Sequence, residues 1–193
     1  MNIVLVEPEI PPNTGNVARL CAATKTTLHL IEPFGFKLED KELKRAGMDY
    51  WQHVEWQRWA SWTAFQLKLP AQARLWFVES GGPQLYTEIR YTADDYLIFG
   101  RETAGLPRKL LAQHRDRWLR IPMFNPKARS LNLSNCVALV LFEALRQQGF
   151  GGQICRGAFS GNVAGHASRG DVSHFGFRFP DQGEDILRVI RCE

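Results

Sequence analysis

Short apolar runs alternate with segments of helical character over the first 150 residues, and this alternation constrains the fold more than any other feature. The runs cover residues 2–6, 27–31, 74–78, 96–99 and 118–121, and each is apolar at nearly every position. Helices are expected from near Gly15 onward and over residues 40–46, 60–68, 107–113 and 131–148. Continuously apolar strands are typical of a parallel sheet with both faces covered. The sequence therefore predicts an α/β domain with a mainly parallel sheet and helices on both faces.

The composition changes after residue 150. Residues 151–193 hold eight of the 16 glycines and none of the six tryptophans. They also contain five arginines and five acidic residues, so the formal net charge of +4 lies entirely in residues 1–150. We predict one domain over residues 1–150, followed by a glycine-rich and poorly ordered extension over residues 151–193.

Several classes of protein are excluded by these patterns. No run approaches the ~18 consecutive apolar residues of a membrane span, and Glu7 interrupts the first run too early for a signal peptide. We therefore expect a cytoplasmic protein with no membrane partner. The five histidines are scattered and no cluster has metal-ligand spacing, so no catalytic metal is expected. The first strand–helix junction has one glycine and three prolines, where a dinucleotide-binding fold needs G-x-G-x-x-G.

That first junction nevertheless carries a candidate ligand site. Its prolines are expected to prevent regular structure through Asn13, which then caps the helix. Asn16 and Arg19 follow within the next turns. Free N–H groups at such a helix start can meet a phosphate or a ribose. The alternative is a capped helix with a surface arginine.

Two later loops also carry more than a turn requires. Residues 99–107 follow a strand and contain Gly100, Glu102 and Gly105, at the kind of position where α/β sheets bind ligands. A simple strand-to-helix turn is the alternative. In the loop after residue 121, four small hydrogen-bonding side chains gather at a helix start, namely Ser130, Asn132, Ser134 and Asn135. Capping needs one or two of them, so the surplus indicates a functional role.

Together the three loops resemble the three motifs of SPOUT-class RNA 2′-O-methyltransferases: N-x-G-N with a following arginine, G-x-E-x-x-G-L, and I-P-M with S-L-N-L-S-N. The match is close to the TrmL (YibK-like) tRNA group and runs from Asn2 to about Gly149. It implies a deep C-terminal trefoil knot, a homodimer and S-adenosyl-L-methionine as cofactor. The implied reaction methylates the 2′-hydroxyl of a cytidine or uridine ribose at the wobble position of tRNA. Another tRNA position, ribosomal RNA, or a knotted RNA-binding protein without catalysis are the alternatives.

The resemblance also implies roles for individual residues. Because a guanidinium stays protonated, we expect Arg19 to orient the hydroxyl and stabilise charge rather than to act as a base. The expected catalytic set is Arg19, Asn13, Asn16, Glu102, Ser130 and Asn132. The expected cofactor-binding set is Val78, Gly100, Ile121, Met123, Ser130 and Leu131. The RNA-binding candidates are Lys41, Lys44, Arg45, Lys127 and Arg129, for which a solvated charged surface is the alternative. Phe142 stands where relatives often carry a tyrosine, so a role that needs that hydroxyl is in question.

Overall fold

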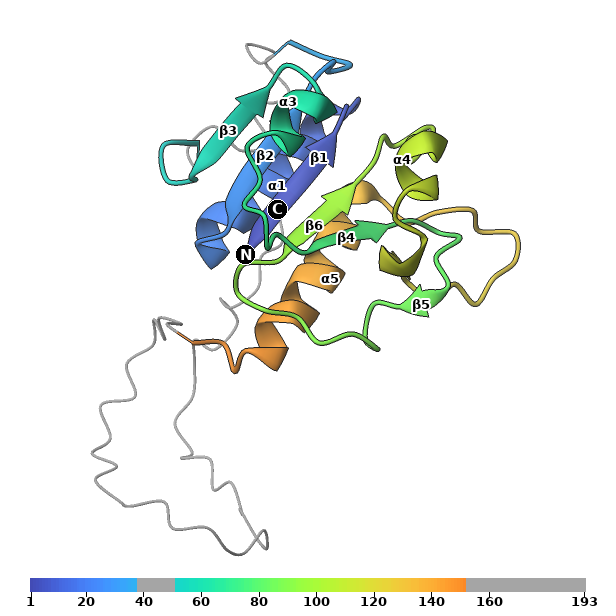
Figure 1. The fold of residues 1–193 in the computed structure, drawn as a ribbon. Coiled ribbons are helices and arrows are strands. Elements are labelled where there is room, and N and C mark those ends of the chain that lie inside the picture. The colour runs from blue at the N-terminus through green and yellow to red at the C-terminus, as the bar shows by residue number, and fades with distance from the viewer. Residues whose placement is uncertain (38–50, 152–193) are drawn as a thin grey trace, which may run out of the picture. The chain divides into compact units, whose positions relative to one another are not determined.

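Seven parallel strands form one sheet within residues 1–37 and 51–151, the part of the chain that the computed structural model describes (Figure 1). Their order across the sheet is β3-β2-β1-β6-β4-β7-β5, and every neighbouring pair is parallel. The strands are Asn2–Val6 (β1), Thr27–Ile31 (β2), Trp56–Trp59 (β3), Leu75–Val78 (β4), Gln84–Leu85 (β5), Tyr96–Phe99 (β6) and Trp118–Arg120 (β7). The predicted parallel sheet is confirmed.

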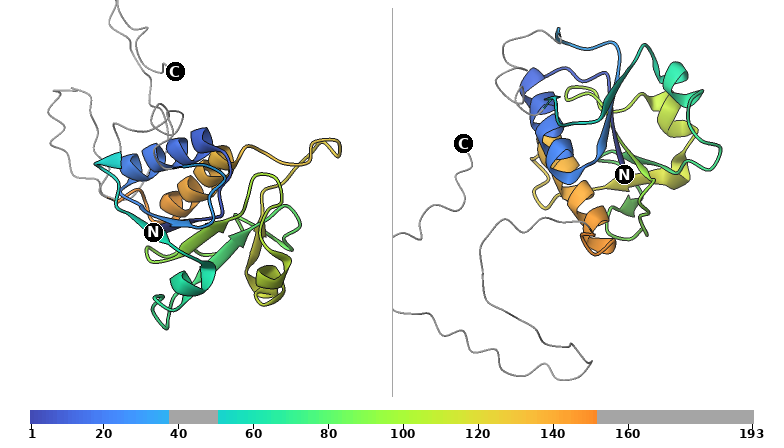
Figure 2. Two further views of the ribbon diagram at one scale, coloured as in Figure 1. Left: turned by 90° about the horizontal axis from the view of Figure 1, so that it is seen from above. Right: turned by 90° about the vertical axis from the view of Figure 1, so that its left-hand side faces the viewer.

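Helices cover both faces of this sheet. They are Pro11–Thr24 (α1), Trp62–Gln66 (α3), Arg108–Ala112 (α4), Leu133–Gln147 (α5) and the short 3₁₀ turn Arg115–Arg117 (η1). Figure 2 shows α1 and α5 side by side on one face, with α3 and α4 on the other. Ile3 and Leu5 of β1 join the core beneath α1 and α5, whereas Val4 and Val6 join the core beneath α3 and α4. This double burial explains why the strand is apolar at consecutive positions.

The two strands that the sequence did not predict both lie at edges of the sheet. β3 is an edge strand whose middle residues, Gln57 and Arg58, are exposed, and β5 has only two residues. Edge strands need no continuous apolar run, so they lack the signal that identified the others. Two helices are also shorter than predicted. The helix predicted over residues 60–68 is α3, Trp62–Gln66, and the helix predicted over residues 107–113 is α4, Arg108–Ala112.

The start of α1 corrects the sequence prediction. The helix begins at Pro11 rather than near Gly15, and Ile10 occupies the N-cap position that was expected for Asn13. Prolines are tolerated in the first turn because its N–H groups have no partner within the helix. Asn13 therefore lies inside the helix. Its side chain is 5% exposed and is available for contacts with other loops.

The topology brings the three motif loops to one edge of the sheet, namely the edge formed by the carboxyl ends of the parallel strands. The chain runs outward from β1 to β2 and β3, then crosses to the other side of β1, where β4 and β5 form before β6 pairs with β1. Ligands of open α/β sheets bind at the carboxyl ends of the strands where the order reverses in this way. The three loops follow β1, β6 and β7, and all three strands end at this edge.

Some predictions lie outside the described residues. They are the helix over residues 40–46, the RNA-binding candidates Lys41, Lys44 and Arg45, and residues 152–193 of the extension. No helix in the described ranges is both long and apolar enough to cross a membrane.

Candidate active site

A chain of side-chain hydrogen bonds joins the three motif loops. Glu102, in the loop after β6, accepts at Oε1 from Asn13 Nδ2 of α1 at 3.0 Å. Asn13 Oδ1 in turn accepts from Asn132 Nδ2 at 2.8 Å. Asn132 is the N-cap of α5, and its Oδ1 accepts from the Ser134 N–H at 2.9 Å. Among the predicted catalytic residues, Asn13 thus contacts both Glu102 and Asn132.

The ends of this chain fix the orientation of both amides. A carboxylate can only accept, so Asn13 must turn its NH₂ group toward Glu102. A helix N–H can only donate, so Asn132 must turn its carbonyl oxygen toward Ser134. Between them the only remaining match is Asn132 NH₂ to Asn13 oxygen, which is the observed contact. The network therefore has a single hydrogen-bonding arrangement.

Glu9 and Glu102 form a second, reciprocal link between the first two loops. Glu102 accepts from the backbone N–H of Glu9 at 2.9 Å and of Ile10 at 3.3 Å. Glu9 Oε2 accepts from the N–H and hydroxyl of Thr103 at 3.1 and 2.6 Å. The sequence did not identify Glu9 or Thr103, because the pairing joins residues 94 positions apart and has no local pattern. An ion pair between Arg101 and Glu7 joins the same two loops.

Close backbone packing shapes the loop after β6. Arg101 and Gly105 exchange two backbone hydrogen bonds of 3.2 and 2.9 Å across the turn. A Cβ at Gly100 would lie 2.2 Å from the Gly105 carbonyl carbon, and Gly105 itself has a φ of +66°. The Glu79 carboxylate, after β4, accepts from the Leu106 N–H at 3.0 Å. Glycine is required at both positions for this turn to close.

The residues predicted to bind the cofactor follow neighbouring strands. Val78 ends β4, Gly100 follows β6 and Ile121 follows β7, and these three strands are adjacent in the sheet. Val78 and Ile121 are half-buried and pack against the core beneath α5. Met123 and Leu131 are exposed by 37% and 39%. Apolar side chains and main-chain groups thus share one sheet edge, which suits a ligand that combines a flat base with an aliphatic chain.

Cys136 of α5 is the thiol nearest to this arrangement in sequence. It follows Asn132 by one turn, and its pKa is raised by burial, with the Glu79 carboxylate adding to the increase. A thiol kept neutral in this way is a poor nucleophile. The site therefore offers amides, carboxylates and hydroxyls for positioning, and no activated thiol.

Comparison with known proteins decides the family. Residues 1–142 match the SpoU rRNA Methylase family. The chain belongs to the SpoU methylase family. This confirms the resemblance inferred from the three loops.

Individual relatives match at least 75% of the chain of this SpoU methylase. A tRNA (cytidine(34)-2′-O)-methyltransferase of Saccharophagus degradans is 52% identical over 154 residues, which make up 78% of this chain and 97% of that protein. A structure described as giving structural insights into the 2-OH methylation of C/U34 on tRNA is 46% identical, with a TM-score of 0.74 over 77% of this chain and 96% of that one. An AdoMet-bound rRNA methyltransferase from Sinorhizobium meliloti is 27% identical, with a TM-score of 0.65 over 75% of this chain and 55% of that one.

The other polar and charged site residues predicted for this SpoU methylase are exposed where the structure describes them. Asn16 and Arg19 are exposed on α1, and Ser130 is exposed in the loop before α5. Lys127 and Arg129 are exposed in the same loop. Asn16 and Arg19 are three positions apart, which places them on one face of the helix. Their roles in catalysis and RNA binding remain predictions.

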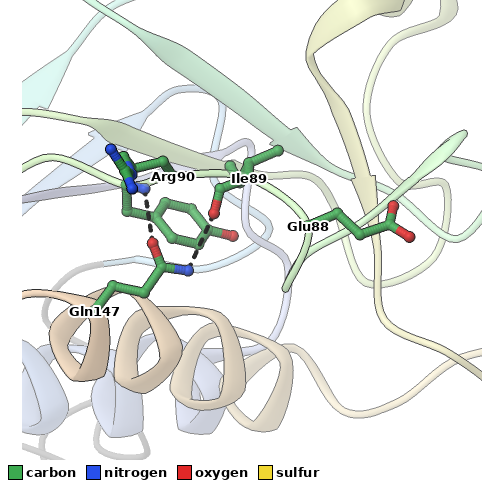
Figure 3. A pocket seen from close by; sticks show the side chains of 5 residues that line it. Glu88, Ile89, Arg90 and Gln147 are labelled. Atoms are coloured by element: carbon green, nitrogen blue, oxygen red, sulfur yellow. Dashed lines mark hydrogen bonds between the residues drawn. The ribbon is translucent and has the colours of Figure 1, made fainter.

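A pocket of about 560 Å³ lies at the other end of the sheet (Figure 3). Gln147, in the last turn of α5, accepts from the Tyr91 N–H and donates to the Ile89 carbonyl, both at 3.0 Å. A helix of this length places Gln147 about 20 Å from Asn132 at its start. The Gln147 amide thus ties the segment before β6 to α5 through two backbone hydrogen bonds. The pocket that it lines is separate from the motif site.

Proposed function

We propose that this SpoU methylase is an S-adenosylmethionine-dependent tRNA (cytidine/uridine-2′-O)-methyltransferase acting on the wobble ribose, position 34. The observation that carries the proposal is the Glu102–Asn13–Asn132 network, which joins one residue from each motif loop. The substrate class is supported by the 52% identity to a relative named for cytidine 34 of tRNA. It is also supported by the 46% identity to the structure described for C/U34.

The sheet edge fits S-adenosylmethionine through its apolar side chains and main-chain groups. The residues that would hold this cofactor are Val78, Gly100, Ile121, Met123, Ser130 and Leu131. S-adenosylmethionine, when bound, supplies a methyl group activated by its positively charged sulfur. An AdoMet-bound structure among the relatives supports this assignment. No metal ion is needed for methyl transfer of this kind.

The residues of this chain then have to position the 2′-hydroxyl and stabilise the charge that develops on it. A neutral hydroxyl is a weak nucleophile, so it must lie in line with the methyl group as its proton leaves. Arg19 stays protonated and supplies positive charge to the oxygen or the adjacent phosphate. Asn16 and Ser130 contact the ribose. Asn13, Glu102 and Asn132 hold α1 and the two loops at a fixed separation, which sets where the hydroxyl can lie.

We further propose a homodimer, a trefoil knot in the C-terminal part of the domain and a cytoplasmic location, where tRNA is found. The dimer proposal is supported by two apolar side chains of α5 that face away from the core. Leu139 and Phe142 are 43% and 48% exposed, whereas the opposite face of the helix is buried. Apolar side chains in this position are typical of a subunit interface. The ring of Phe142 suits such apolar packing, and packing does not need the hydroxyl of the tyrosine that relatives often carry at this position.

Methyl transfer to bulk tRNA tests the proposal. Purified protein is incubated with methyl-labelled S-adenosylmethionine and tRNA from cells that lack this enzyme, and label in the tRNA is counted. Arg19→Ala should fold normally and reduce the incorporation by at least about 100-fold, the usual effect of removing a charge-stabilising group. No label in the tRNA would contradict the substrate class, and wild-type rates in Arg19→Ala would contradict its role.

A further inference from the structure

We infer that Phe124, in the loop between β7 and α5, stacks on a base of the tRNA beside the nucleotide that is methylated. This inference rests on the proposed function. It adds a residue that recognises the substrate without contacting the reacting atoms.

The ring of Phe124 is not part of the hydrophobic core. Its side chain is 95% exposed, more than any other large apolar residue in the described ranges. Every residue from 122 to 132 is exposed. The gold-coloured loop between β7 and α5 projects away from the sheet in Figure 1 and in the left view of Figure 2. The ring therefore stands on a projecting loop, where a planar ligand can reach its face.

The charge around this ring favours a nucleic acid. Residues 121–132 contain Lys127 and Arg129 and no acidic residue. Within the described part of the chain, no ion pair joins either cation to a carboxylate. An exposed aromatic ring beside unpaired cations is the combination that single-stranded nucleic-acid sites use, with the ring under a base and the cations along the phosphates. A subunit interface would instead favour a continuous apolar patch, but polar or charged side chains at Asn125, Lys127, Arg129 and Ser130 separate Phe124 and the exposed Met123 from Leu131.

The same loop leads directly into the proposed active site. Ser130 follows Phe124 by six residues, so the two lie at most about 20 Å apart even with the chain fully extended. Asn132, two residues further on, is tied to Asn13 at 2.8 Å. The wobble nucleotide belongs to an unpaired loop of tRNA, and RNA loops present bases that can be splayed onto aromatic side chains. Phe124 is thus placed to hold a neighbouring base while the wobble ribose lies at the network.

Stacking can be separated from other roles by comparing Phe124→Ala, Phe124→Leu and Phe124→Trp. Loss of one stacked base should raise the KM for tRNA, and the Kd for tRNA in filter binding, by about 10- to 100-fold in the alanine variant. Leucine should resemble alanine because it has no ring, and tryptophan should resemble the wild type. The kcat at saturating tRNA and the Kd for S-adenosylmethionine should stay within about twofold. Leu67→Ala, at the other strongly exposed apolar side chain (80%), is the matched control and should change nothing.

Three results would overturn the inference. Unchanged tRNA binding in Phe124→Ala would show that the ring does not contact the substrate. Weaker cofactor binding would assign the ring to the cofactor site, and dissociation of a dimer in sedimentation would assign it to a subunit interface. The proposed function fails separately, if the wild-type protein transfers no methyl group to tRNA. Filter binding does not depend on catalysis and still tests Phe124 in that case.

Discussion

At the scale of single residues, the arrangement depends on an amide at position 13. Asn13→Asp changes one NH₂ group to an oxygen and places a second carboxylate against Glu102, at the position of a 3.0 Å hydrogen bond. Two carboxylates at this distance repel and cannot both stay ionised in place. We predict that methyl transfer falls by about 100-fold or more at neutral pH, measured as single-turnover rates with tRNA. Gln57→Glu makes the same chemical change on the exposed edge strand β3, and its rate should match the wild type.

His29 makes a second residue-scale prediction, on stability. Burial lowers its pKa from 6.5 to about 4, and its Nδ1 accepts from the Trp59 indole N–H at 3.2 Å. Between pH 4 and pH 6.5, His29 is protonated in the unfolded chain but neutral in the folded chain. Stability should therefore fall as the pH decreases from about 6.5 to about 4, by up to about 1.4 kcal/mol per pH unit from this group. Urea unfolding across that range should show a smaller decrease in His29→Gln, and equal decreases in both proteins would contradict the assignment.

The sequence could identify the three residues of the hydrogen-bonded network, Asn13, Glu102 and Asn132, because the motif loops carry more polar side chains than turns need. It could not show how they pair. Asn13 was expected to cap a helix, but Pro11 and Pro12 begin that helix earlier, and the amide instead bonds to Glu102. Glu9 and Thr103 were missed because neither is unusual where it stands, and only the fold brings them together.

At the scale of elements, the buried strands were predictable and the edges were not. β1, β2 and β6 occupy the predicted ranges because burial on both faces leaves a continuous apolar run. β3 and β5 lie at the edges, where exposure removes this pattern. Their positions depend on the neighbouring strand, and a local window of sequence contains no information on that neighbour.

The turn after β6 gives a prediction at this scale. A methyl group at Gly100 would lie 2.2 Å from backbone of Gly105, so Gly100→Ala must displace residues 101–105. We predict a loss of about 1–3 kcal/mol in the free energy of unfolding, together with loss of S-adenosylmethionine binding in calorimetry. Gly81→Ala is the matched control, because a methyl group there meets nothing within 4 Å. Equal behaviour of the two variants would show that the close approach is unimportant.

At the scale of the whole molecule, the predicted domain and extension divide the chain into unequal parts. The family match ends at residue 142, and the formal net charge of +4 lies entirely in residues 1–150. We predict that a chain ending at Gly151 keeps the wild-type kcat and KM for tRNA within about twofold, because the family match and every predicted site residue lie before it. Loss of activity in that shorter chain would show that the extension contributes to the site.

The proposed reaction is defined by the atom that receives the methyl group, the 2′-oxygen of the wobble ribose. Labelled tRNA from the transfer reaction can be digested and the modified nucleotide mapped by mass spectrometry. We predict a single 2′-O-methylated cytidine or uridine at the wobble position, and no label when that nucleotide is replaced by its 2′-deoxy form. A methyl group on a base, or on a ribose elsewhere in the tRNA, would contradict the account.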